Sequence, residues 1–152
     1  MSQDLQTCTE KDVLNLEDDA PLRGPRAVFL IDIQNPCWML RVADLSRAAR
    51  LTAAVGQVPF NFQIGRDIES IHLRPPHTPA GELEVRLDGC EGEPIAVLPL
   101  APAAGNDAVT ELPSVVLPQS VRSLAGAHSL CFTFTQRTLD PMWAIDWVQL
   151  SP

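Results

Sequence analysis

The sequence predicts an all-β protein, an antiparallel β-sandwich of the jelly-roll type. Apolar and polar residues alternate with a period of two in many short segments, which is typical of half-buried strands. Fourteen prolines and eight glycines are scattered along the 152 residues, so they separate short elements instead of forming a linker. No long segment has a helical period, and many short strands between frequent turns favour antiparallel sheets.

The N-terminal part of the chain predicts a loose segment followed by three strands. Residues 1–12 begin with a polar stretch and are expected to be flexible. Strands are predicted at residues 13–16, 27–33 and 37–42. The second of these is apolar without interruption, which predicts that both of its faces are buried. Residues 44–50 have the composition of a short helical turn.

The middle of the chain predicts five further strands. They are residues 51–55, 59–65, 68–73, 83–87 and 94–100. In the fourth of them, apolar residues alternate with charged ones, which predicts a strand with one solvated face. Turns rich in glycine and proline stand on both sides of that strand.

The last third of the chain predicts the strands that complete the sandwich. A strand at residues 109–117 is followed by residues 129–135, where leucine and phenylalanine alternate with small polar residues. Residues 143–150 form the last predicted strand. Because this strand carries two tryptophans at the end of the domain, we expect it to lie in the centre of a sheet.

Charge and length argue against several classes of function. The net charge is −8 and Lys11 is the single lysine, whereas binding to a phosphate backbone needs clustered Lys and Arg. No apolar run reaches the roughly 20 residues that a membrane-spanning helix needs. We therefore expect no nucleic-acid partner and no membrane partner. Residues 13–152 are long enough for one domain with a sizeable core.

Four cysteines, Cys8, Cys37, Cys90 and Cys131, are spread over the chain. Zinc sites usually take ligands from close pairs, and the three histidines are equally dispersed, so this spacing argues against a zinc cluster. Two disulfides are expected, in any of three connectivities. The alternative is buried reduced thiols, because free cysteine behaves as a small hydrophobe. Disulfides would indicate a periplasmic or extracellular protein.

Four segments, residues 81–88, 95–100, 126–134 and 145–150, follow one another in a distinctive order. The third contains Gly-Ala-His-Ser-Leu and the fourth contains Ile-Asp-Trp. In order and spacing the chain resembles family 6 carbohydrate-binding modules over residues 14–150. This resemblance implies a β-sandwich like that of galactose-binding domains, without catalytic activity of its own and attached to a glycoside hydrolase.

Three other segments, residues 16–21, 35–38 and 55–65, resemble the C-terminal region of bacterial family 20 β-N-acetylhexosaminidases. This resemblance implies a non-catalytic accessory domain whose partner is its own catalytic domain. Hexosaminidase chemistry needs a carboxylic acid pair in a barrel, which this chain is too short and too rich in strands to contain. The alternative is a functional carbohydrate-binding module for chitin-type or other oligosaccharides.

The resemblance also indicates a degenerate sugar cleft. Family members stack a sugar ring between aromatic side chains and hydrogen-bond it with an asparagine. The matching positions in this chain are Leu40, the loop at Asn106, and Ala144. Loss of the aromatic platform and the amide predicts weak binding or none at that cleft.

A second sugar site of the family lies on the concave face of a sheet. Gln57, Asn61 and Gln63 are candidates for this site, because amides offer paired donors and acceptors to hydroxyl groups. The simpler interpretation is that they form the polar face of a strand.

The three tryptophans have structural and functional interpretations. Trp143 is either an exposed platform for sugar or a packing residue. Trp147 matches a core aromatic of the family. Trp38 stands next to Cys37, and an indole packed against a disulfide is a common core arrangement.

The resemblance further implies one structural calcium ion. Family members take its ligands from the first strand and from the Asp of the last strand. Asn15, Glu17 and Asp146 match these positions, and carbonyl groups near Arg23 and Gly24 would complete an oxygen shell. The alternative is that the acidic residues near the first strand form a solvated turn and that Asp146 accepts from local backbone amides.

Overall fold

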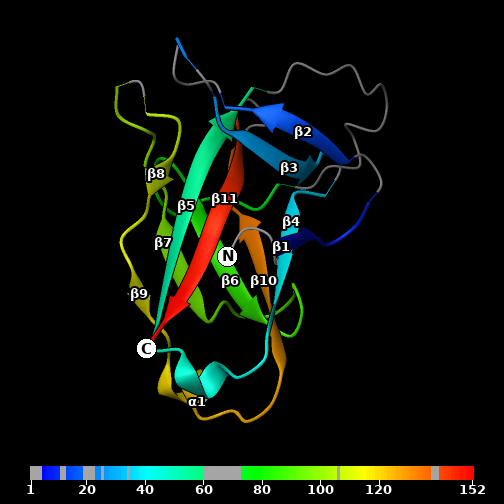
Figure 1. Ribbon diagram of the computed structural model, residues 1–152, viewed down its shortest axis with the longest axis vertical. Helices are drawn as coiled ribbons and strands as arrows, with labels where there is room; N and C mark the ends of the chain where they lie inside the picture. The colour runs from blue at the N-terminus through cyan, green and yellow to red at the C-terminus, as the bar shows by residue number, and fades with distance from the viewer. Residues whose placement is uncertain are drawn as a thin grey trace.

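The structure is a computed structural model of the chain and describes residues 5–10, 13–18, 23–24, 26–33, 35–59, 73–105, 107–137 and 141–152. Within these residues, antiparallel strands dominate, with one short α-helix and one 3₁₀ turn (Figure 1). The prediction of an all-β sandwich is confirmed. None of the helices in the described ranges is long and apolar enough to cross a bilayer.

Five strands form the larger sheet, in the order β1-β4-β10-β6-β7. Their bounds are Leu5–Thr7 for β1, Cys37–Val42 for β4, His128–Phe134 for β10, Glu82–Leu87 for β6 and Ala96–Pro99 for β7. Every neighbouring pair is antiparallel. The predicted alternation holds, because the leucine and phenylalanine side chains of β10 enter the core while its cysteine and threonine side chains point to the outer face.

The smaller sheet is built on two long strands, β5 (Arg50–Val58) and β11 (Met142–Ser151). Figure 1 shows these two strands side by side in front of the larger sheet. Two short strands, β8 (Thr110–Glu111) and β9 (Val115–Val116), also pair with β5. The prediction of one strand at residues 109–117 is wrong, because Pro113 has no N–H to continue the ladder between β8 and β9.

The position of β11 differs from the prediction. Among the described strands it pairs only with β5, so it lies at the edge of the described part of its sheet and not in the expected central position. Its inner face is buried against the larger sheet, and β3 packs against it as well. Its register against β5 shifts between Ile145 and Trp147. Such a bulge changes the face to which the following side chains point.

The remaining two strands, β2 (Val13–Glu17) and β3 (Val28–Asp32), form a separate antiparallel hairpin. In Figure 1 this hairpin lies across the upper end of the sandwich. The apolar run of β3 does not have two buried faces, since Val28 is 56% exposed and Leu30 is 45% exposed. The prediction fails because a two-stranded ribbon packs one face on the core and has no layer over the other.

Two short elements, β1 and α1 (Gln119–Arg122), depart from the predicted set. β1 lies within residues 1–12, where no strand was expected, and three residues are too few to show a period. The helix α1 was also not expected, whereas the 3₁₀ turn η2 (Leu45–Arg47) lies in the predicted helical turn. The predicted strands at residues 59–65 and 68–73 lie outside the described residues, except for their end residues 59 and 73.

Three aromatic side chains connect the two sheets through the core. Trp38 on β4 meets Phe134 edge to face, with ring centroids 5.5 Å apart, and Phe134 stacks on Trp143 of β11 at 6.5 Å. The indole N–H of Trp38 donates to the carbonyl of Leu30 at 3.0 Å. Trp38 is therefore a core residue, as expected, but it does not pack as expected on a disulfide, because adjacent residues of a strand face opposite sides.

Candidate functional site

A pocket of about 500 Å³ lies where β5 ends and β11 begins. We call it the end pocket. Two of the predicted sugar-binding residues, Gln57 and Trp143, are part of its lining. The other two, Asn61 and Gln63, lie outside the described residues. Gln136 and Arg137 add polar groups, and four prolines supply most of the apolar wall: Pro76, Pro79, Pro102 and Pro141.

A buried carboxylate fixes one wall of the end pocket. Glu82 accepts hydrogen bonds from the backbone N–H groups of His77 (2.9 Å) and Thr78 (2.8 Å) and from the hydroxyl of Thr135 (3.0 Å). Burial raises the pKa of Glu82, but the hydrogen bond from the Thr78 hydroxyl, together with those already named, outweighs burial and lowers the pKa below its usual range. Gly81 has a positive φ of 89°, and a Cβ there would lie 2.2 Å from the carbonyl oxygen of Thr135. The backbone of this wall therefore depends on two adjacent residues, the glycine at position 81 and the ionised carboxylate of Glu82.

Trp143 contributes little surface to the end pocket. It is 5% exposed and stacks on Phe134, so the packing interpretation of this residue is confirmed. The other aromatic residues of the larger sheet and of β3 are buried too. Within the described residues, the end pocket thus offers amide and guanidinium groups but no open aromatic face. Such a lining favours polar contacts over stacking.

The two side chains assigned to a degenerate cleft do not line a cleft. Leu40 is 5% exposed and Ala144 is 0% exposed, and both belong to the hydrophobic core. A core position is closed to a ligand, and the correspondence of these two residues to the sugar-contacting positions of the family stays a prediction. Asn106 lies outside the described residues.

Trp147 lies on the outer face of the smaller sheet. The register shift after Ile145 pairs Trp147 with Ala54, while the next residue, Val148, pairs with Ala53 and enters the core. Trp147 is half-buried and lies outside the core cluster, so its predicted core position is wrong. The sequence signal for this placement is weak, since a bulge leaves the apolar pattern almost unchanged.

Hydrogen-bonding side chains surround Trp147 on this outer face. Directly opposed residues of neighbouring strands point to the same side. Ala54 opposes Trp147 on one side and Glu111 on the other, so only a methyl group stands between the indole and the carboxylate. Gln149 opposes Thr52, whose hydroxyl lies 2.5 Å from that of Ser114. We call the side chains on this face the outer-face cluster: Thr52, Ala54, Glu111, Ser114, Trp147 and Gln149.

The expected calcium ligands lie on two elements. Asn15 and Glu17 are exposed on β2, and they oppose Leu30 and Val28 of β3. Val28 and Leu30 line a second cavity of about 200 Å³, to which Asp146 of β11 also contributes.

Arg23 and Gly24, whose carbonyls were expected to complete the shell, are exposed. Burial alone raises the pKa of Asp146, and a cation at this carboxylate would act in the opposite direction. Within the described ranges, Glu17 and Asp146 are not part of a group of three acidic, His or Cys side chains close enough to share a metal ion. These side chains alone therefore do not complete a calcium shell, which would need backbone or water oxygens as well.

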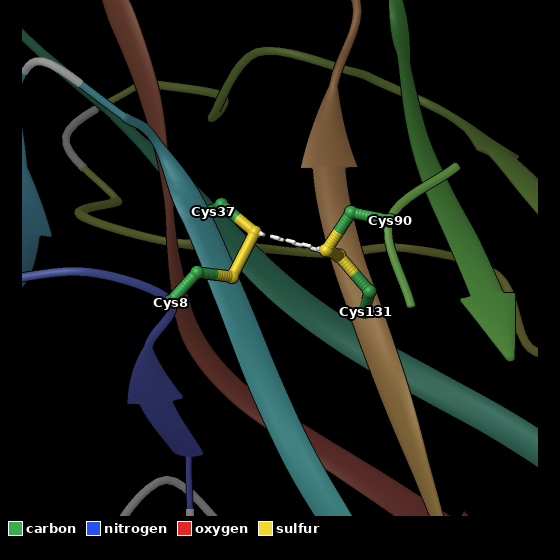
Figure 2. Close-up of side chains that lie close together, drawn as sticks. All are labelled: Cys8, Cys37, Cys90 and Cys131. Atoms are coloured by element: carbon green, nitrogen blue, oxygen red, sulfur yellow. Dashed lines mark hydrogen bonds between the residues drawn. A yellow bond between two sulfur atoms is a disulfide. The ribbon is translucent and has the colours of Figure 1, made fainter. Parts of the chain in front are cut away.

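The four cysteines form two disulfides, Cys8–Cys37 and Cys90–Cys131. The expectation of two disulfides is confirmed, and the structure selects one of the three connectivities. Figure 2 shows the two bridges meeting between β4 and β10, with all four cysteines close together. All four Sγ atoms lie within 4.8 Å of one another, so the dispersed spacing in the sequence was misleading about their distance in space.

Comparisons with known proteins support the fold. No protein-family model and no curated protein matches the chain. CsCBM6-3 from Clostridium stercorarium, solved with cellobiose, is 15% identical at a TM-score of 0.52, with 99% of this chain and 89% of that one covered. A family 6 carbohydrate-binding module from Clostridium cellulolyticum, solved with xylose, is 14% identical at a TM-score of 0.51, with coverages of 93% and 91%.

A third solved structure is much longer than this chain. It is a glycoside hydrolase family 43 arabinoxylan arabinofuranohydrolase from Bacillus subtilis, solved with cellotetraose, at 20% identity and a TM-score of 0.49. The match covers 91% of this chain but spans only 24% of that enzyme. The two family 6 modules with TM-scores of 0.52 and 0.51 confirm the expected likeness for the fold, and the resemblance to family 20 enzymes stays a prediction.

Proposed function

We propose that this chain is a non-catalytic accessory domain of a glycoside hydrolase that contacts carbohydrate through the outer-face cluster. The observation that carries the proposal is the position of Trp147, the one aromatic side chain among the described residues that is not buried. The fold supports it, because solved structures of the same fold hold cellobiose and xylose.

The chemistry of the outer-face cluster suits a sugar ring. The C–H face of a sugar packs on an aromatic ring, and its hydroxyl groups need donors and acceptors around the rim. Trp147 supplies the ring, while Gln149 and Glu111 are exposed beside it. Ala54, which opposes both Trp147 and Glu111, is itself only 1% exposed, so a sugar ring on this face would contact the exposed parts of the neighbouring side chains and not the methyl group.

The end pocket has a minor role in this proposal. Gln57, Gln136 and Arg137 would hydrogen-bond hydroxyl groups, but each such bond replaces one to water and adds little net free energy. With a single aromatic surface on the whole described part of the chain, we expect dissociation constants of about 1 mM or above, near −4 kcal/mol.

Calorimetric titration of the isolated domain tests the proposal. The sugars are cellobiose, xylose, N-acetylglucosamine and chito-oligosaccharides, and the proteins are the natural chain, Trp147→Ala and Gln57→Ala. We expect weak binding of at least one sugar, a loss of at least fivefold for Trp147→Ala and little change for Gln57→Ala. A loss confined to Gln57→Ala would move the site to the end pocket, and the absence of binding to any sugar would reject a carbohydrate function.

The preference among these sugars bears on the parent enzyme. The resemblance to family 20 enzymes leads us to propose a β-N-acetylhexosaminidase as the parent and a periplasmic or extracellular location. The two disulfides support an oxidising compartment. Preference for chito-oligosaccharides over cellobiose would support this parent, and the reverse preference would favour an enzyme acting on plant polysaccharides.

A second function, docking onto the parent's catalytic domain, rests on the hairpin β2–β3. Val28 and Leu30 are both more than two-fifths exposed and share one face of β3. Apolar side chains of this kind are common at contacts between domains. In the full-length parent, Val28→Ser together with Leu30→Ser is expected to lower the melting temperature without changing sugar affinity. An unchanged melting temperature would argue against docking at this face.

The structural calcium ion also stays a proposal. Asn15, Glu17 and Asp146 would hold it, and binding would remove the cost of the partly buried carboxylate of Asp146. We expect excess Ca²⁺ to raise the melting temperature of the natural domain and to have no effect on Asp146→Asn. Equal melting temperatures with Ca²⁺ and with a chelator would reject the site.

A further inference from the structure

The two disulfides meet at a single point on the outer face of the larger sheet. Cys8 follows β1, Cys37 begins β4, Cys131 lies in β10 and Cys90 follows β6. These four strands are consecutive in the sheet order, so each contributes one cysteine to the same spot. The Sγ atom of Cys37 lies 3.4 Å from both the Sγ of Cys90 and that of Cys131. In Figure 2 the dashed line marks this contact between the two bridges.

This convergence exceeds what two independent disulfides need. Each bridge requires only its own two cysteines to be neighbours, yet the pairs are close enough for all four sulfurs to lie within 4.8 Å. A tetrahedral zinc site with Zn–S bonds of about 2.3 Å places its four sulfurs about 3.8 Å apart. The sulfurs of different bridges are thus within about 1 Å of that spacing, and the two sulfurs of each bridge would have to move apart after reduction.

The surroundings of the cluster suit a metal centre. Cys37 and Cys131 are buried at 4% and 1% exposure, while Cys8 and Cys90 are half-buried and leave a path from solvent. Arg74 donates to the carbonyl of Cys90 at 3.0 Å. Its guanidinium lies beside the loop of Cys90 and would offset part of the negative charge of four thiolates around one divalent ion. Buried thiols with a nearby cation and a rigid sheet behind them are a preorganised ligand set.

Thiol–disulfide exchange between the two bridges is an alternative role for the four cysteines, but it fits their geometry less well than a shared metal site does. Thiol–disulfide exchange needs the attacking sulfur to approach along the axis of the bond that it breaks. The sulfur of Cys37 is equally far from Cys90 and Cys131, so it faces the middle of their bond and not one end.

We propose that the four cysteines have a second, reduced state in which they bind one Zn²⁺ as a tetrathiolate site. Each disulfide accepts two electrons and two protons and becomes two thiols. A dithiol supplies both and is itself oxidised to a disulfide, whereas a phosphine supplies the electrons and becomes a phosphine oxide, with the oxygen and the protons taken from water. Zn²⁺ then replaces the four thiol protons, which leave to solvent. In the oxidised state the sulfurs are bonded to each other and carry no charge, so zinc binds only after reduction.

The experiment compares the oxidised domain with the domain reduced by a phosphine, both with Zn²⁺ and with Co²⁺ as a spectroscopic substitute. We expect one zinc per reduced chain by native mass spectrometry and none per oxidised chain. Bound Co²⁺ should give thiolate-to-metal charge-transfer bands and the visible bands of tetrahedral cobalt. Cys37→Ser should weaken metal binding at least tenfold.

Met39→Leu is the matched control. The Met39 sulfur lies 3.9 Å from the Sγ of Cys90 but is not one of the four proposed ligands, so this variant should bind zinc as the natural chain does. Where reduction unfolds the chain, added zinc should restore the circular dichroism of the folded domain. A reduced chain that binds no zinc, or that stays unfolded with zinc, overturns the proposal, as does a Cys37→Ser variant with unchanged affinity.

Discussion

Trp143 and Trp147 lie four residues apart on one strand and have different environments. Trp143 is 5% exposed and stacks on Phe134 between the two sheets. Trp147 is half-buried on the outer face, opposite Ala54. The register shift between Ile145 and Trp147 separates them, because it changes the side of β11 from which the following side chains project.

A local backbone irregularity can therefore place a residue type that is usually buried, here tryptophan, on the surface of the sheet. In a regular strand, residues four apart lie on the same face, so both indoles would enter the core. The two ends of the outer face differ as well. Near Gly56 it is covered by Phe29 of β3, whereas near Trp147 the side chains of Gln149 and Glu111 are exposed, although Ala54 between the strands is buried. Among the described residues of this face, the exposed side chains Glu111 and Gln149 lie at the end that carries Trp147.

The largest effect is expected for Trp143→Ala. Removing an indole from the aromatic stack leaves a cavity that the sheets cannot fill, and large-to-small changes of this kind cost about 3–5 kcal/mol. Chemical denaturation of both proteins measures the difference in the free energy of unfolding. A loss below about 1 kcal/mol would mean that Trp143 is not a core residue.

The second effect concerns the covered end of the outer face. A Cβ at Gly56 would lie 2.4 Å from Cζ of Phe29 and 2.5 Å from Oδ2 of Asp18. We expect Gly56→Ala to destabilise the domain by about 1–3 kcal/mol through overpacking. Gly89→Ala is the control, because no atom lies within 4 Å of a Cβ at that position. Equal melting temperatures for the two variants would show that β3 does not cover this end.

A smaller effect on stability is expected for Trp147→Ala. Its side chain is half-buried and outside the core cluster, so the cost in the free energy of unfolding should be about 1 kcal/mol or less. The same denaturation experiment as for Trp143→Ala measures it. Were Trp147→Ala as damaging as Trp143→Ala, the two tryptophans would be equivalent structural residues and the comparison would fail.

The smallest effect is the pH dependence of the pair His128–Asp88, which lies away from both tryptophans. Nδ1 of His128 is 2.7 Å from a carboxylate oxygen of Asp88. This contact raises the pKa of His128 above 6.5. The hydrogen bond from the backbone N–H of Ser129 makes the largest contribution to lowering the pKa of Asp88 below 3.8, and the hydrogen bond with the His128 side chain makes the second largest.

The two shifts define the pH range in which the pair stabilises the fold. The contribution of His128 is complete below pH 6.5 and is lost as the pH rises through the folded pKa. The contribution of Asp88 is complete above pH 3.8 and is lost as the pH falls through its folded pKa. The urea concentration at the midpoint of unfolding should therefore be lower for His128→Gln than for the natural chain, and the difference should be largest between pH 3.8 and pH 6.5. A difference in urea midpoint between the two proteins that is the same at every pH would contradict the pairing of His128 with Asp88.

The sequence predicted the strands whose alternation is long and regular. β4, β6 and β10 each have a core face of apolar side chains, and their boundaries were close to those expected. β1 escaped prediction because three residues carry no period, and Pro113 divided a strand that the apolar pattern joined. These misses concern elements whose formation depends on neighbours distant in sequence.

The candidate site was harder to predict for the same reason. Gln57 and Trp143 do lie together in the end pocket, but the outer-face cluster depends on the bulge before Trp147 and on the pairing of β5 with β8. The meeting of the cysteines depends on the order of four strands, which their spacing in the chain does not reveal. Register and strand order are set by tertiary packing, which a single sequence describes poorly.

The most direct test of the account is to observe the indole N–H signals of Trp143 and Trp147 by NMR during titration with the sugar that binds best. We expect the Trp147 signal to shift in proportion to occupancy, together with the backbone signals of Thr52 and Gln149, while the Trp143 signal stays in place. A shift of Trp143 and of the end-pocket residue Gln57, with Trp147 unchanged, would contradict it.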